Sequence, residues 1–487
     1  MGAQPNILVF MTDQQCGDTF TGPNRPLTPN VDAFRENAVT FTDAYCTAPH
    51  CCPSRASFFS GKYPTQHGVW NNVEVDNALS HGLYDGVTLF PERLQESGYH
   101  TVFSGKWHVS AYEGPEDRGF DENRYEYISN YGRFSPLNRP RHKDWELLYN
   151  RPLPTKAGQP DKPMGCLCRE GYPDHQQFAT HPDMYGDAMT VEEACKALQE
   201  PDNGKPLFLY VGTTGPHDPY NPPQEFLDLY KDTEIHLPEN FHDTLKDKPN
   251  FYRRTQDRYA LTEQEHKECI RHYMAFTSYE DALFGKVLNC LQSTGRMENT
   301  YVFYLSDHGD YMGAHGLWAK GLPCFREAYH ICALMGGGPI RGAHTVNELV
   351  SITDFAPTIL ELAGLEPEAD SMGRSLLPFV RGEQPDSWRT EHFTQTNGNE
   401  LYGIQRAVWN KKWKYVFNGF DYDELYDLEK DPGELVNLIE RKELQPVVRQ
   451  MCKKLWQFAR DTGDNCTCAY IMVSLAPYGP GILFEYE

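Results

Sequence analysis

Four short runs of apolar residues along the chain each end close to a polar residue of a type that serves in catalysis or ligand binding. They cover residues 7–11, 101–103, 207–211 and 301–305, and the polar residues that follow them are Asp13, Lys106, His217 and Asp307. Short, almost continuous apolar runs are typical of strands buried on both faces, as in a parallel sheet. Such sheets bind ligands at the carboxyl ends of their strands, and this is where the four polar residues fall.

Helical patterns lie between these runs. Thr190 with Glu193, and Thr262 with Glu265, have the spacing of a capping box and predict two helix starts. In the second helix Gly295 is the predicted stop, and apolar residues recur at helical spacing before it: Phe276, Tyr279, Leu283, Val287 and Leu291. A further helix is predicted over residues 354–363. Strands that alternate with helices predict an α/β fold with a doubly wound sheet.

The pattern changes after a connection over residues 367–385. Residues 403–409 and 413–417 flank a polar turn at 410–412, which predicts a β-hairpin. We therefore expect two domains, a large α/β domain over residues 1–375 and a smaller one with an antiparallel sheet and a tail over residues 376–487.

Composition and charge limit the classes of function that the chain can have. The chain has 487 residues, 39% of them hydrophobic, and a net charge of −23, which argues against a general nucleic-acid binder. An anionic ligand would need its own cluster of cations in such a protein. No stretch reaches the about 20 apolar residues of a membrane helix. No basic segment precedes residues 7–11, so we expect no secretory signal, a cytoplasmic location, and mostly buried thiols among the 14 cysteines.

The most specific signal is the pentapeptide CCPSR at residues 51–55. Pro53 suits the first turn of a helix, so Cys51 is predicted to lie at a helix N-terminus, where exposed N–H groups and the helix dipole favour an anion. One alternative is a buried structural cysteine. Another is a zinc site built from Cys46, His50, Cys51 and Cys52, although adjacent cysteines rarely share one zinc ion with good geometry.

The whole stretch TAPHCCPSRASFFSGKYPTQHGVWNN, residues 47–72, resembles the signature of the type I sulfatases of the alkaline-phosphatase superfamily. Further matches follow in the family's order at Asp13, at GKWH (residues 105–108), at Pro216-His217, at Asp307-His308 and at Lys320. The resemblance implies a large mixed, mostly parallel sheet flanked by helices, with a smaller C-terminal antiparallel-sheet subdomain. It also implies hydrolysis of a sulfate ester.

In that family the cysteine that matches Cys51 is converted to formylglycine by a formylglycine-generating maturation enzyme. One hydroxyl of the aldehyde hydrate attacks sulfur, and the other later expels sulfate as the carbonyl re-forms. Arg55 lies one helical turn after Cys51, so we expect it to hold the hydrate and counter its charge.

The resemblance also assigns roles to four further residues. Lys106 would contact sulfate oxygens, and His108 would take the proton from the hydrate as the sulfated intermediate collapses. His217 and Lys320 match the pair that contacts sulfate and helps the leaving oxygen depart. The reference pKa of histidine lies near neutrality, which suits His217 to general acid catalysis.

One divalent metal ion is expected, and the residues that match the family's ligands are Asp13, Gln14, Cys51, Asp307 and His308. Gln14 and His308 stand where many sulfatases carry Asp and Asn, and this combination is similar to choline sulfatases and phosphonate monoester hydrolases. Fewer anionic ligands make Mn²⁺ an alternative to the expected Ca²⁺. Asn72 lies where that branch places a substrate-side Asn.

The leaving group stays open between a sulfated carbohydrate and another small organic sulfate such as choline sulfate. Three other functions are weighed: a phosphonate monoester or phosphodiester hydrolase, a non-catalytic binder of sulfated ligands, and a hydrolase that uses an unmodified Cys–His pair. The KWH element at residues 106–108 favours the sulfatase.

Two further segments have structural expectations. We expect the basic loop 133–143 to be solvated rather than a substrate-binding lip. We expect the apolar tail 466–487 to cover the core or to exchange between subunits of a homo-oligomer.

Overall fold

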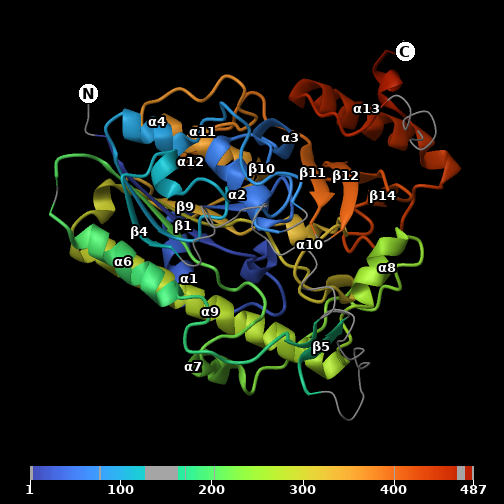
Figure 1. Ribbon diagram of the computed structural model, residues 1–487, viewed down its shortest axis with the longest axis horizontal. Coiled ribbons are helices and arrows are strands. Elements are labelled where there is room, and N and C mark those ends of the chain that lie inside the picture. Colours follow the sequence, from blue (N-terminus) through green and yellow to red (C-terminus); the bar gives the residue numbers. More distant parts are fainter. Residues whose placement is uncertain are drawn as a thin grey trace.

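An eight-stranded sheet forms the centre of the protein (Figure 1). The computed structural model describes residues 4–75, 78–126, 163–169, 172–201, 203–399, 401–468 and 478–484. In spatial order the strands are β10 (His344–Ser351), β2 (Ala38–Tyr45), β9 (Ala333–Gly337), β8 (Thr300–Ser306), β1 (Asn6–Thr12), β7 (Leu207–Gly212), β3 (His100–Gly105) and β4 (Glu122–Glu126). Strand β9 runs antiparallel to β2 and β8, and the other pairings are parallel. The four predicted apolar runs are strands β1, β3, β7 and β8, so the predicted sheet is confirmed.

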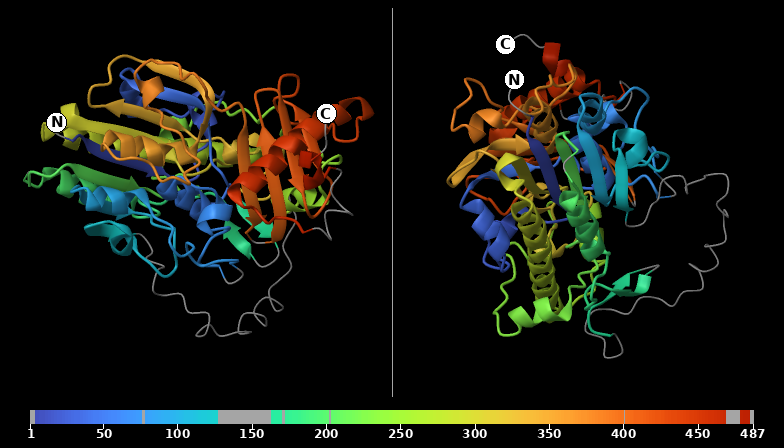
Figure 2. Two further views of the ribbon diagram at one scale, coloured as in Figure 1. Left: turned by 90° about the horizontal axis from the view of Figure 1, so that it is seen from above. Right: turned by 90° about the vertical axis from the view of Figure 1, so that its left-hand side faces the viewer.

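Helices cover both faces of this sheet (Figure 2). One face packs against α2 (Cys51–Ser60), α4 (Phe90–Glu96), α11 (Phe355–Leu362) and α12 (Leu377–Val380), and the other against α1 (Pro29–Arg35), α6 (Asp187–Gln199) and α9 (Glu263–Ser293). The short helices α3 (Pro64–His67), α7 (Gln224–Leu227), α8 (Asn250–Gln256) and α10 (Arg326–Tyr329) complete the domain. Alternate residues of β1 enter the two cores, which explains its unbroken apolar sequence.

One of the two predicted helix starts is correct. Helix α9 begins after Thr262, whose side chain accepts a hydrogen bond from the backbone of Glu265, and the predicted apolar positions of α9 are buried. The other prediction is wrong, because α6 begins at Asp187 and Thr190 lies inside it. The carboxylate of Asp183 accepts the backbone N–H groups of Asp187 and Ala188, so the helix starts four residues earlier than predicted.

A separate four-stranded antiparallel sheet contains β11 (His392–Gly398), β12 (Tyr402–Trp409), β13 (Trp413–Asn418) and β14 (Glu424–Asp427). Strands β12 and β13 confirm the predicted hairpin. Helix α13 (Gln445–Thr462) packs on one face, while Ala407, Trp409, Val416 and Tyr426 on the other face join the core of the large sheet. The domain boundary at residues 375–376 stays a prediction. Strands β5 (Cys166–Arg169) and β6 (Tyr172–Gln176) form a small third sheet.

Part of the C-terminal tail covers α13. Ile482 in the 3-10 turn η8 (Pro480–Phe484) is buried in the same apolar cluster as α13, and Trp456 donates its indole N–H to the carbonyl of Tyr478. The predicted covering role is confirmed for this segment, and subunit exchange stays a prediction. The predicted loop 133–143 lies outside the described residues. Within the described part of the chain no two cysteines form a disulfide, and most of the cysteines are buried. No helix in that part has the length and apolar character to cross a membrane.

A buried ion pair fastens the end of α13 to β12. Arg406 and Asp464 are 3% and 1% exposed, and their two contacts measure 2.6 Å and 3.2 Å. We expect Asp464→Ala to lower the free energy of unfolding by about 3–5 kcal/mol, because it leaves a buried guanidinium without its anion. The control is Asp461→Ala, which removes the exposed pair with Arg460 and should cost at most about 1 kcal/mol. Urea unfolding measures both, and equal costs would contradict this account.

Candidate active site

Strand register brings the predicted polar residues to one edge of the large sheet. Thr12 of β1 pairs with Ser306 of β8, so the next residues, Asp13 and Asp307, lie side by side. Gly105 of β3 pairs with Gly212 of β7 at the same edge, and Lys106 follows directly. The expectation that these strand ends share an edge is therefore confirmed.

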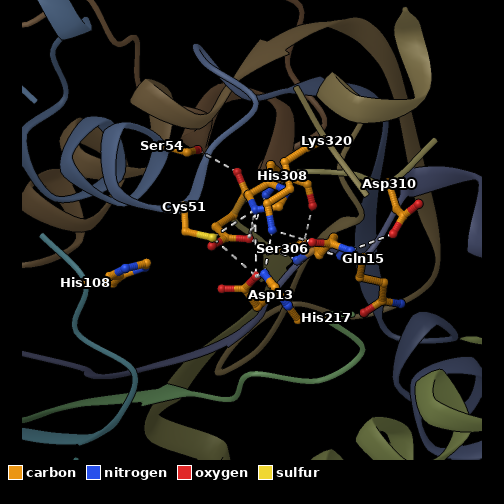
Figure 3. A network of polar contacts seen from close by, with 12 residues as sticks. Asp13, Gln15, Cys51, Ser54, His108, His217, Ser306, His308, Asp310 and Lys320 are labelled. Atoms are coloured by element: carbon orange, nitrogen blue, oxygen red, sulfur yellow. Dashed lines mark hydrogen bonds and ion pairs between the residues drawn. The ribbon is translucent and has the colours of Figure 1, made fainter. Parts of the chain in front are cut away.

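Cys51 is the first residue of α2, as predicted, and points into this edge (Figure 3). Its Sγ lies 3.2 Å from His308 Nε2 and 3.6 Å from Asp13 Oδ1. The donor atoms of Asp13, Cys51, Asp307 and His308 all lie within 4.8 Å of one another, and all four residues are buried. Among the described residues, the alternative set of Cys46, His50, Cys51 and Cys52 forms no such cluster.

Two cations, the buried Arg55 and the partly buried Lys106, neutralise the two carboxylates. Arg55 donates from Nε to Asp307 over 2.8 Å and from Nη2 to Asp13 over 3.0 Å, while Lys106 Nζ lies 2.7 Å from Asp13. Burial alone would raise the pKa of Asp13, but Lys106 and Arg55 hold this pKa below its ordinary value. Burial and the charge of Asp13 raise the pKa of Asp307. The two carboxylates and their two cationic partners thus lie in a space that is largely closed to water.

The surroundings of Cys51 favour an anion. Burial by itself would raise the pKa of the thiol, but the positive charges of Lys106, Lys320 and His308 lower it well below the ordinary value. Any negatively charged group held at this position gains from the same charges.

His217 and Lys320 form a pair on the opposite side of Asp13 from Cys51 (Figure 3). His217 Nδ1 lies 2.6 Å from the carbonyl oxygen of Asp218, so Nδ1 carries the hydrogen and Nε2 accepts from the Lys320 ammonium. Lys320 also donates to Gln14 Oε1. The Gln14 amide nitrogen donates to Asp310 over 2.6 Å, so both ends of this amide are used in linking Lys320 to Asp310.

Glu74 belongs to the site although no motif points to it. Its carboxylate lies 2.7 Å from His108 Nε2. Burial alone would raise the pKa of Glu74, but His108 lowers it to about 2. Burial raises the pKa of the neighbouring Cys52 thiol to about 11, so this thiol is neutral at pH 7. Burial alone would lower the pKa of His108, but the pKa lies well above its ordinary value, and Glu74 is the anion that keeps the imidazole charged.

A cavity of about 360 Å³ opens above Cys51. Its lining includes Asn72, Lys106, His108, Tyr185 and His217. The Asn72 side chain accepts the backbone N–H of Cys52 over 3.4 Å, which fixes it beside the start of α2. The predicted residues Cys51, Asn72, Lys106, His108 and His217 line this cavity. Gln14 and Arg55 are joined by hydrogen bonds to the buried cluster, and Lys320 is joined to His217.

Comparison with known proteins decides the family. The sulfatase family model matches residues 5–365. The chain belongs to the sulfatase family. It is therefore a sulfuric ester hydrolase with the expected fold. A second model, N-sulphoglucosamine sulphohydrolase, C-terminal, matches residues 313–461 of this sulfatase.

Known relatives cover nearly the whole sulfatase. A choline-sulfatase from Rhizobium meliloti is 31% identical over 453 residues, which cover 90% of this chain and 83% of the relative. The fold is similar to that of a protein solved in complex with its substrate D-glucosamine-2-N,6-O-disulfate, with a TM-score of 0.72, 20% identity, and coverage of 95% and 99% of the two chains. A phosphonate monoester hydrolase from Silicibacter pomeroyi has a TM-score of 0.75 at 20% identity, with coverage of 95% and 96%.

A pair of buried acids supports the loop that carries His217, and the sequence gives no sign of it. Asp187 accepts the backbone N–H groups of Thr214 and Gly215 over 2.8 Å and 2.9 Å. Glu280 of α9 lies against Gly215 and interacts with Asp187. Burial raises the pKa of both acids. The charge of Asp187 raises the pKa of Glu280 further, and the charge of Asp183 raises that of Asp187, so the pair retains a proton at pH values where ordinary carboxyls are ionised.

The acid pair makes a prediction for stability against pH. An acid whose pKa is higher in the folded state binds protons on folding, so the free energy of unfolding falls as the pH rises above the ordinary carboxyl range. We expect the free energy of unfolding of Glu280→Gln to fall less between pH 5 and pH 8 than that of the wild type. The difference should be about 1.4 kcal/mol for each unit by which folding raises the pKa of the removed acid within this range. Urea unfolding at the two pH values measures it. The control is Glu263→Gln, an exposed acid at the start of the same helix, and a similar effect of both variants would count against the pair.

Proposed function

We propose that this sulfatase hydrolyses a sulfate ester of a carbohydrate, using a formylglycine made from Cys51. One observation carries the proposal: the Cys51 side chain is buried at the start of α2 in surroundings that favour an anion. A sulfate group needs such surroundings in a chain with a net charge of −23. Formylglycine in its hydrated form supplies a hydroxyl to attack sulfur and a second one to release sulfate.

The buried cluster fits a divalent cation. Asp13, Asp307 and His308 supply two carboxylates and an imidazole, all buried and facing one another, which is a set of ligands that divalent cations accept. We propose these three residues and the modified Cys51 as ligands. Gln14 is proposed as a further ligand, whose amide oxygen would exchange its hydrogen bond from Lys320 for the cation. Ca²⁺ is the expected ion, and the imidazole makes Mn²⁺ the alternative. When bound, the cation polarises the sulfate oxygens and lowers the pKa of the attacking hydroxyl.

The cations of the chain hold the sulfate group. Burial would lower the pKa of Lys106 and Lys320, but the negative charges around them raise it in both cases, so both are ammonium ions at neutral pH. Lys106 follows the end of β3 and contacts Asp13, and Lys320 lies beside His217. Arg55 keeps the carboxylates of Asp13 and Asp307 in place and adds positive charge next to Cys51.

The hydrogen bonds at His217 support a source for the proton that reaches the leaving oxygen, namely Lys320. Because Nδ1 of His217 donates to the Asp218 carbonyl, Nε2 has no hydrogen of its own and accepts one from Lys320. The Lys320 ammonium therefore holds the proton at rest, and we propose that Lys320 and His217 deliver it together as the ester bond breaks.

The leaving group is proposed to be a sugar. The cavity above Cys51 combines an aromatic wall, Tyr185, with groups that bond to hydroxyls, among them Asn72, Ser110 and Glu126. The N-sulphoglucosamine sulphohydrolase match and the fold shared with a protein that binds a disulfated glucosamine support this choice. Choline sulfate is the second candidate, since Glu74, Glu126 and Asp218 would suit a cation and the relative quoted above is a choline-sulfatase.

The first test is turnover of 4-nitrophenyl sulfate by protein produced together with a formylglycine-generating enzyme. We expect sulfate release that disappears in Cys51→Ala, because this variant lacks the nucleophile. Peptide mass at residue 51 is the control for modification. A panel of sulfated sugars and choline sulfate then identifies the leaving group. Fully modified protein that hydrolyses aryl phosphonates but no sulfate would overturn the proposal.

The contact between Glu74 and His108 predicts a pH effect. As a proton acceptor His108 must be neutral, and its raised pKa places the acid limb of kcat above the ordinary histidine range. Removing the anion in Glu74→Gln should lower this pKa and move the limb to lower pH. The pH profile of kcat for 4-nitrophenyl sulfate measures the shift. Glu116→Gln, at an exposed acid outside the cavity, is the matched control, and an unmoved limb in Glu74→Gln would exclude the role.

A further inference from the structure

A second cavity of about 210 Å³ adjoins the first. The two cavities share Asn72, His217 and Asp218, but Cys51 lines the first and Lys320 lines the second. His217 and Lys320 release the leaving oxygen in the proposed function, on which this inference rests. The second cavity therefore lies where the part of the substrate beyond the cleaved bond can extend.

This cavity contains a cation that the fold does not use. Arg258, directly after α8, is partly buried and lines the cavity. Its guanidinium makes no ion pair or side-chain hydrogen bond with any residue in the described part of the chain. The chain carries 68 acidic residues against 45 Lys and Arg, so carboxylates are plentiful partners for an arginine. A guanidinium left without one beside a catalytic centre is available to an anionic ligand.

A buried amide in the same cavity also lacks a partner. Gln177 is 1% exposed, and neither its amide oxygen nor its amide nitrogen has a hydrogen-bond partner among the described residues. Leaving a buried polar group unsatisfied costs about 1–3 kcal/mol, so native structures usually satisfy it with protein, water or ligand. The side chain offers a donor and an acceptor together, which suits the hydroxyl groups of a sugar.

The remaining walls suit the flat faces of a ring. Phe251 and Tyr259 are aromatic, and Leu322 and Leu401 add apolar surface. Tyr259 is fixed by a hydrogen bond from its hydroxyl to the carbonyl of Trp318. Apolar walls with a few convergent polar groups are typical of small-molecule sites.

We propose that this second cavity binds an anionic sugar unit, in which a carboxylate or second sulfate group pairs with Arg258 and a hydroxyl bonds to Gln177. The preferred substrate then carries two negative charges, one on the sulfate that is cleaved and one on the part that leaves. This explains why the cavity has a guanidinium and an amide without partners among the described residues.

Competition against 4-nitrophenyl sulfate turnover tests this inference. The competitors are glucosamine 6-sulfate with one anion, glucosamine 2-N,6-O-disulfate with two sulfates, and glucuronosyl-glucosamine 6-sulfate with a sulfate and a carboxylate. We expect the wild type to bind one or both of the two-anion compounds more tightly than the first. Arg258→Ala should reduce this preference about tenfold, as expected for one charged hydrogen bond. Arg258→Lys should keep part of it, and Gln177→Glu should abolish it by repulsion.

The matched control is Arg254→Ala, which removes an exposed arginine of the neighbouring α8 that does not line this cavity. It should keep the wild-type preference. Equal affinity of the wild type for all three compounds would overturn the inference, and so would equal losses in the Arg254 and Arg258 variants.

Failure of the proposed function is distinguishable from failure of this inference. Modified wild-type protein that does not hydrolyse 4-nitrophenyl sulfate contradicts the proposed function alone. In that case calorimetric titration of Cys51→Ala with the same three compounds measures the preference for two anions without any turnover. Thermal unfolding of each variant confirms that a lost preference is not lost folding.

Discussion

Two buried carboxylates at the edge of the large sheet, with the two cations that neutralise them, are the constraint on which the site depends. Asp13 and Asp307 are held beside each other by strand register, and Arg55 and Lys106 are the charges that make this burial affordable. Arg55 is wholly buried and lies in α2, one helical turn after Cys51. The ion pairs therefore set the position of α2 against the sheet, and with it the place of Cys51, the proposed nucleophile.

An acidic protein binds an anion here by local rather than overall charge. The net charge of −23 is spread over the surface, where water and salt screen it. The cations around Cys51 lie in a buried space, where screening is weak and their effect on a thiol is large enough to outweigh burial. The same reasoning applies to the second cavity, where Arg258 keeps its charge available because no described carboxylate takes it.

Much of this arrangement follows from the sequence, because short apolar runs that end at polar residues specify both the strands and the edge where they converge. The residues around Cys51 were found by resemblance to a family whose motifs are contiguous in sequence. Glu74, Asp187 and Glu280 were not found, since each acts on a residue that only the tertiary fold brings near it. Arg258 was not found because only the fold places it in the wall of a cavity. The start of α6 was missed for a related reason. Its cap, Asp183, reaches over the intervening Gly186, outside the spacing of a capping box.

Because β1 pairs with β8 in parallel, the proposed metal cluster depends on the correct alignment of these two strands. Side chains alternate between the two faces of a strand, and each step along it covers about 3.3 Å. A slip of one residue between these strands would preserve a ladder of backbone hydrogen bonds, yet it would carry Asp307 away from Asp13 and turn it towards the other face. A misaligned sheet could thus remain folded by most spectroscopic criteria while having no affinity for the cation, so metal uptake distinguishes correctly registered molecules from those that are merely compact.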